Sequence, residues 1–266
     1  MDAVTSLHGR AVGLGAANAA GQQLVSRGGF LSGSHGSQFA HPSPAMVSYV
    51  DDFIGDVLAD QWNIVEGTDS STTDAAILAG GIGGILRFTT GDAGTGLAAD
   101  MVQMTQALQW QASNGGLFVE ARFKLSAITT CYAFFGFTDV VTLEAPIISA
   151  ASADTLTTTA TDAVGVMFDT RMSTDNWWLV GVATDVDATA QNSGYAPVAG
   201  TWEVWRIELS EAGVATFFRN GVQIGTAMAG AVTAGADLTP TFAVGKTSVT
   251  ASMTADMDYI ALGMLR

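Results

Sequence analysis

The fold is decided by one stretch near the end of the chain, WEVWRIELSEAGVATFFRNGVQIGTA, which runs from Trp202 to Ala227. In its first part, Trp, Ile and Leu alternate with Arg and Glu, and this period of two predicts a half-buried β-strand. Two apolar runs follow, separated by an Asn-Gly pair that tolerates the positive φ angles of a two-residue hairpin turn. The stretch therefore predicts a three-stranded antiparallel meander over residues 202–209, 214–219 and 222–226.

Similar patterns recur along the chain. The segment LFVEARFKL, from Leu117 to Leu125, places five apolar side chains on one face and Phe, Glu, Arg and Lys on the other. Residues 97–111 suit a helix or a strand equally. Roughly a dozen short strands with little helix predict an all-β sandwich or barrel. The remaining strands are expected over residues 62–65, 84–89, 132–137, 164–168, 177–182, 241–244 and 257–262.

Composition narrows the class of protein. The 266 residues include 31 Gly and carry a net charge of −15, with only 13% charged residues. Phosphate binding needs a basic surface, so a nucleic-acid partner is not expected. No apolar run reaches the length of a membrane span, and the first residues do not resemble a signal peptide. The single cysteine, Cys131, lies in an apolar stretch and is expected to be a buried hydrophobe.

The chain changes character near residue 47, which predicts an extended arm over 1–46 and a folded body over 47–266. The arm is rich in Gly, Ser and Ala, without a helix or strand period. It has two basic residues and one acidic residue, whereas the body has eight basic and 24 acidic ones. A disordered tail is one interpretation; isolated anchors favour an arm that docks on neighbouring subunits. The proposed docking residues are Leu24, Arg27, Phe30, Leu31 and Phe39.

Three segments together resemble the concanavalin A-like jelly rolls, a superfamily that includes laminin G-like modules, legume-type lectins and laminarinase-type glycoside hydrolases. The first segment is the meander, with its tryptophan and Asn-Gly turn. The second is YVDDFIGDVLADQWNIVEG, from residue 49, where an Asp-Phe pair precedes a Trp. The third is MDYIALGMLR, from residue 257, an Asp-Tyr pair in an alternating apolar run. The resemblance covers about residues 47–266 and implies a two-sheet antiparallel jelly-roll sandwich.

The resemblance raises the question of catalysis. A retaining glycosidase needs two carboxylates about 5 Å apart, and the laminarinase-type enzymes carry theirs as Glu-x-Asp on one strand. None of the six glutamates of this chain is followed by Asp two residues later. A Ser-His-Asp hydrolase needs a histidine, and all three histidines lie in the first 41 residues. We therefore expect a protein that is not an enzyme and has no cofactor.

Two kinds of binding site are weighed. Calcium could be held by oxygen ligands near Asp169 and Asp175 or near Asp185 and Asp187, although Asp is also common in turns for local reasons. The turn interpretation is preferred for both pairs. A sugar would need exposed aromatic rings. The candidate rings are Trp177, Trp178, Tyr195 and Trp202, against the alternative that one member of the Trp177–Trp178 pair is core and the other packs under a loop or a neighbour.

The absence of a catalytic motif, the acidic body and the arm suggest a structural protein. In style the chain resembles virion proteins of tailed bacteriophages, most closely a capsid decoration protein. That resemblance implies synthesis in the host cytoplasm, a place in the virion, and partners among capsid proteins or copies of itself. The alternative is a carbohydrate-binding, lectin-like module that recognises surface glycans. A divergent glycoside hydrolase or lyase is the third hypothesis.

Overall fold

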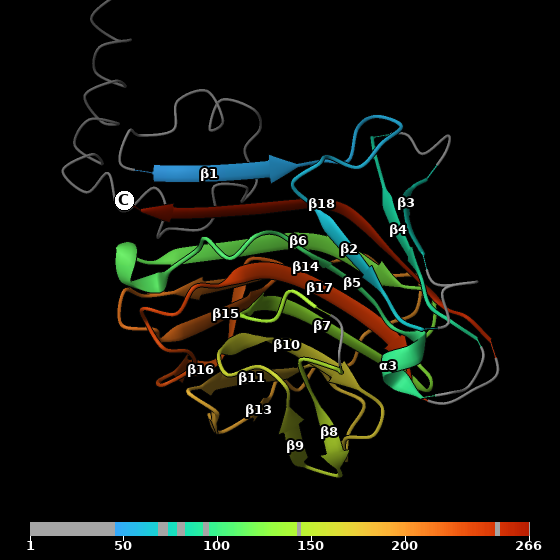
Figure 1. Cartoon of the computed structure of the whole chain (residues 1–266). Helices are drawn as coiled ribbons and strands as arrows, with labels where there is room; N and C mark the ends of the chain where they lie inside the picture. The colour runs from blue at the N-terminus through green and yellow to red at the C-terminus, as the bar shows by residue number, and fades with distance from the viewer. Residues whose placement is uncertain are drawn as a thin grey trace, which may run out of the picture. The chain divides into compact units, whose positions relative to one another are not determined.

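The computed structural model describes residues 46–68, 74–78, 83–92, 96–142, 145–247 and 251–265. Two large antiparallel sheets form a sandwich (Figure 1). In the first sheet the strand order is β16 (Val222–Met228), β15 (Ala215–Arg219), β14 (Glu203–Leu209), β6 (Leu117–Leu125), β18 (Thr254–Leu265), β4 (Leu86–Thr89) and β3 (Asp74–Ile77), and β1 (Met46–Asp51) also pairs with β18.

The second sheet faces the first. Its order is β12 (Val186–Asp187), β11 (Trp178–Ala183), β10 (Ala163–Asp169), β7 (Cys131–Thr138), β17 (Thr239–Lys246), β5 (Val102–Thr105) and β2 (Asn63–Glu66), and β13 (Gln191–Asn192) also pairs with β11. A separate hairpin joins β8 (Ile148–Ser152) to β9 (Thr155–Thr158). Helical structure in the described residues is limited to α3 (Leu97–Asp100) and the 3₁₀ turn η2 (Ala112–Asn114). The predicted all-β sandwich is confirmed.

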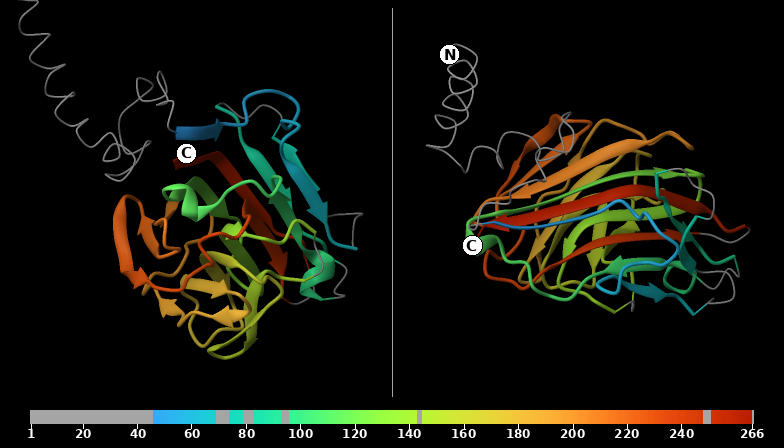
Figure 2. Two further views of the ribbon diagram at one scale, coloured as in Figure 1. Left: turned by 60° about the vertical axis from the view of Figure 1, so that its left-hand side comes forward. Right: turned by 90° about the horizontal axis from the view of Figure 1, so that it is seen from above.

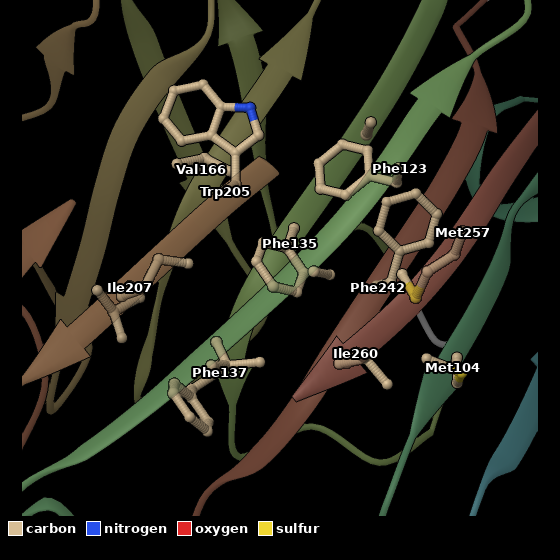
Figure 3. Close-up of a cluster of buried hydrophobic side chains, with 14 of the residues drawn as sticks. Met104, Phe123, Phe135, Phe137, Val166, Trp205, Ile207, Phe242, Met257 and Ile260 are labelled. Carbon is tan, nitrogen blue, oxygen red and sulfur yellow. The ribbon is translucent and has the colours of Figure 1, made fainter. Parts of the chain in front are cut away.

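The core lies between the sheets because each strand turns its alternate side chains inward. Figure 3 shows side chains of β6, β14 and β18 directed toward those of β7, β10 and β17. Aromatic rings cross the interface: Phe123 lies 5.0 Å from Phe242 and 5.5 Å from Phe135, centroid to centroid. Cys131 is also buried, which raises the pKa of its thiol to about 12. The cysteine is a small core residue, as expected.

The meander forms as predicted. β14 pairs with β15, β15 pairs with β16, and the turn has φ angles of 50° at Asn220 and 79° at Gly221. The ambiguous segment 97–111 contains both kinds of structure, since α3 is followed at once by β5. The helix is short because its residues are needed next as a strand: β5 lies between β2 and β17.

The first described residues belong to the sandwich. β1 pairs with β18 from Met46 opposite Leu265 to Asp51 opposite Ile260 (Figure 2, blue beside red). Contacts divide the chain between residues 44 and 45, so the body includes all of β1. The five predicted docking residues of the arm lie outside the described residues. No described helix is long and apolar enough to cross a membrane.

A second apolar cluster lies on the outer face of the second sheet. Tyr132 and Phe134 of β7 belong to it, together with Met167 of β10, while their neighbours in sequence point into the main core. The β8–β9 hairpin contributes Ile148 and Ala150 to this cluster. The hairpin therefore covers part of the face that the sandwich core leaves open.

Candidate functional site

One end of the sandwich carries two surface rings, Trp202 and Tyr195. Trp202 precedes β14 and is partly exposed. Arg122 and Lys124, both on the outer face of β6, place their charged groups 4.8 Å and 4.7 Å from the centroid of its ring. Both distances are within the range of cation–π attraction. The two cations are themselves paired with carboxylates of β18, at 2.7 Å for Asp258 and 3.2 Å for Asp256.

Tyr195 repeats this arrangement on the other side. Its ring is 44% exposed, and the guanidinium of Arg219 lies 4.7 Å from the ring centroid. Arg219 donates two hydrogen bonds to the carboxylate of Glu203, at 3.2 and 2.9 Å, which raises the pKa of the arginine. We call Tyr195, Trp202, Arg122, Lys124 and Arg219 the two-ring surface. Each cation has a carboxylate partner, so this surface is locally neutral on an acidic body.

Backbone hydrogen bonds fix the loop that carries the rings. Trp177 N–H donates to the Tyr195 carbonyl at 2.8 Å, and Gly200 N–H donates to the Leu125 carbonyl at 2.7 Å. Within the loop, Thr201 N–H donates to the Val198 carbonyl at 3.0 Å. The loop is therefore tied to both sheets, and the rings are held in place before any ligand arrives.

A small pocket opens between the two rings. Lys124, which lies over Trp202, forms one wall, and Glu203, which binds the Arg219 that lies over Tyr195, forms another. The enclosed part has room for about one group the size of a water molecule. The other residues that line it are Phe123, Leu125, Trp177, Pro197, Val198 and Thr201.

The four predicted platform residues separate into different places. Tyr195 and Trp202 are at the surface, but Trp177 is only 1% exposed and packs against Phe123 and Trp205, so its proposed role as a sugar platform is wrong. Strand alternation turns Trp177 into the sandwich core. Trp178, which points the opposite way, packs partly buried against the outer apolar cluster.

The four aspartates weighed as calcium ligands do not gather. Asp169 is fully buried, where it accepts hydrogen bonds from Arg171 and from the Ala150 backbone N–H. Asp175, Asp185 and Asp187 are exposed. Among the described residues, no group of three or more His, Cys, Asp or Glu side chains is placed to hold a metal ion. Calcium binding stays a prediction without a located site.

Sequence reasoning missed the cations and the pocket. Arg122 and Lys124 were recognised as outward-facing residues of a strand, but their approach to Trp202 depends on the pairing of β6 with β14. Arg219 and Glu203 are 16 residues apart in sequence and meet because β15 pairs with β14. Val198 carried no signal, since it belongs to a loop without a period.

Comparison with known proteins supports the fold and the carbohydrate connection. No protein-family model and no curated protein matches the sequence. Among solved structures, a protein of unknown function from Shewanella oneidensis has a TM-score of 0.59 at 15% identity, covering 83% of this chain and 87% of that one. A β-glucanase from Bacillus licheniformis has a TM-score of 0.55 at 11% identity, covering 81% and 97%.

The Emp47p carbohydrate recognition domain is a third similar structure, with a TM-score of 0.55 at 8% identity, covering 82% of this chain and 95% of that one. Further neighbours are a lichenase and two endo-1,3-β-glucanases. The jelly-roll resemblance is thus confirmed. The prediction that the protein is not an enzyme is contradicted, because glycoside hydrolases are prominent among its structural neighbours. None of these titles names a virion or capsid protein, so the neighbours give that prediction no support.

Proposed function

We propose that this protein binds carbohydrate through the two-ring surface. The observation that carries the proposal is the pair of surface rings, Tyr195 and Trp202, each held by cations on either side of a small pocket. Sugar rings present apolar C–H faces that stack on aromatic rings, and hydroxyl groups that bond to charged side chains. The fold shared with a carbohydrate recognition domain and with β-glucanases supports this class of ligand.

The local neutrality of the surface favours neutral glycans. Elsewhere the body is strongly acidic, with 24 Asp and Glu against eight Lys and Arg. A polyanionic glycan would be repelled by this charge, while uncharged saccharides are indifferent to it. The rings are also held by paired side chains, so little conformational entropy is lost when a sugar binds.

The test is binding of the full chain to a panel of neutral polysaccharides and their oligomers, measured by titration calorimetry. We expect Trp202→Ala and Tyr195→Ala each to weaken binding at least about tenfold, or about 1.4 kcal/mol. Leu108→Ala is the matched control, because Leu108 is 42% exposed, close to the 44% of Tyr195, and lies in the loop after β5. A panel without any binding, or ring variants that bind like the wild type, would refute the proposal.

The same preparations are assayed for release of reducing ends. The structural neighbours include several glycoside hydrolases, so hydrolysis of a bound glucan is the second candidate function. Release of reducing ends by the wild type, with loss in the ring variants, would place hydrolysis at the same surface. Release that survives in the ring variants would place it elsewhere.

A further inference from the structure

The pocket between the rings contains an unpartnered hydrogen-bond donor. Trp177 lines the pocket and is 1% exposed, and its indole Nε1–H has no hydrogen-bond partner among the described residues. Leaving a buried donor without a partner costs about 1–3 kcal/mol. The other core tryptophan nearby, Trp205, donates its Nε1–H to Glu203 at 3.0 Å. The pocket therefore calls for a group that accepts a hydrogen bond.

The walls restrict what that group can be. Five of the eight lining residues are apolar: Phe123, Leu125, Trp177, Pro197 and Val198. The carboxylate of Glu203 already accepts bonds from Trp205 Nε1 and from two nitrogens of Arg219. A hydroxyl group would bring a proton to a wall whose carboxylate is already engaged. A carbonyl oxygen attached to a methyl group brings an acceptor, no donor and an apolar remainder.

The position of the pocket connects it to the rings. Thr201, which is exposed at its mouth, directly precedes the ring of Trp202, and Val198 is three residues after Tyr195. A sugar stacked on either ring therefore has the pocket within reach of a substituent on its edge. The pocket has room for about one small group, enough for the tip of a substituent but not for a sugar ring.

Resting on the proposed carbohydrate function, we infer that this pocket recognises the acetyl group of an acetylated saccharide. Trp177 Nε1–H donates to the acetyl carbonyl, and the apolar walls surround the methyl group. The acetyl group can be attached through nitrogen or through oxygen, since the recognised carbonyl and methyl are common to both.

The experiment compares ligands that differ in acetylation. Titration calorimetry of the full chain is done with N-acetylglucosamine tetramer against the glucose tetramer of the same linkage. A second arm uses O-acetylated xylo-oligosaccharide before and after removal of its esters. We expect at least about tenfold tighter binding of the acetylated member in one arm or both; the arm that shows it identifies the attachment.

Two variants locate the preference in the pocket. Val198→Phe fills the mouth with a larger side chain at a residue that is 58% exposed, so folding is not at risk. We expect it to remove the preference for the acetylated member while binding of the unsubstituted one changes less than about twofold. Val186→Phe is the matched control at another exposed valine, 68% exposed in β12. Trp177→Phe, which keeps a ring but removes the N–H, should reduce the preference about five- to tenfold.

The outcomes separate this inference from the function on which it rests. Equal, ring-dependent binding of acetylated and unsubstituted ligands would overturn the acetyl pocket and leave carbohydrate binding intact; the pocket would then hold only water. A preference that persists in Val198→Phe would overturn it as well. Failure of the wild type to bind any saccharide would overturn both proposals.

Discussion

Gly136 shows how closely the central strands of the second sheet approach each other. It lies opposite Gly165, where β7 pairs with β10. A Cβ atom at Gly136 would clash with the carbonyl oxygen of Val164 and would lie 2.6 Å from Cα of Gly165. A Cβ at Gly165 would lie 2.7 Å from the ring of Phe134, which covers it. The two facing glycines therefore let an aromatic ring of the outer cluster lie directly on the sheet.

We expect Gly136→Ala to lower the free energy of unfolding by about 3 kcal/mol, because the opposing atoms are backbone and cannot move aside. Urea unfolding followed by tryptophan fluorescence measures the change. Gly235→Ala is the matched control: its Cβ would meet no atom within 4 Å, and we expect a change within about 0.5 kcal/mol. Equal stability of the two variants would contradict the close approach.

The β15–β16 hairpin does more than reverse the chain. The Asn220 side chain accepts a hydrogen bond from Val204 N–H at 2.9 Å, and its own N–H donates to the Val204 carbonyl at 2.8 Å. The turn is thus joined to the start of β14, directly after Trp202. Arg219, which lies over Tyr195, is the last residue before the turn. The hairpin holds one side of the two-ring surface.

Replacement of Asn220 separates the two roles of this residue. Asn220→Ala loses the side-chain hydrogen bond and places alanine at a φ of 50°, so we expect a loss of about 2 kcal/mol in stability. Asn220→Gly tolerates that φ and loses only the bond, so we expect about half the loss. Thermal unfolding of both variants tests this, and an equal loss would show that backbone strain contributes nothing.

Considered as a whole, the body depends on the strand with which its described part begins. β1 runs along β18, Tyr49 packs against the core, and Met46 is buried. Asp51 accepts hydrogen bonds from Tyr49 Oη at 2.9 Å and from Trp62 Nε1 at 2.8 Å. The strand therefore covers an edge of β18 and fixes the loop that leads to β2.

Two truncations test this dependence. A chain of residues 45–266 keeps β1, and we expect it to unfold cooperatively with a midpoint within a few degrees of the full chain. A chain of residues 52–266 lacks β1, and we expect its midpoint to fall by at least about 8 °C, since the loss of six paired residues costs more than about 2 kcal/mol. Scanning calorimetry compares them. Identical midpoints would show that β1 is dispensable.

Local patterns in the sequence were enough for the strands, the meander and the inward face of β6, because alternation and turn chemistry act between neighbours in the chain. Glu120 and Arg122 were correctly placed on one outer face. However, their partners are Arg206 and Asp258, which belong to other strands. The short helix before β5 was also beyond local propensity, because strand pairing decides where it ends.

The candidate site was decided by tertiary structure alone. Four aromatic residues were named from the sequence, yet only strand pairing shows that Trp177 is core and that Tyr195 and Trp202 flank a pocket. The cations that hold the rings come from β6 and β15, far apart in the chain. Local periodicity specifies which way a side chain points, but a site depends on which distant strands become neighbours, and that depends on packing of the whole sandwich.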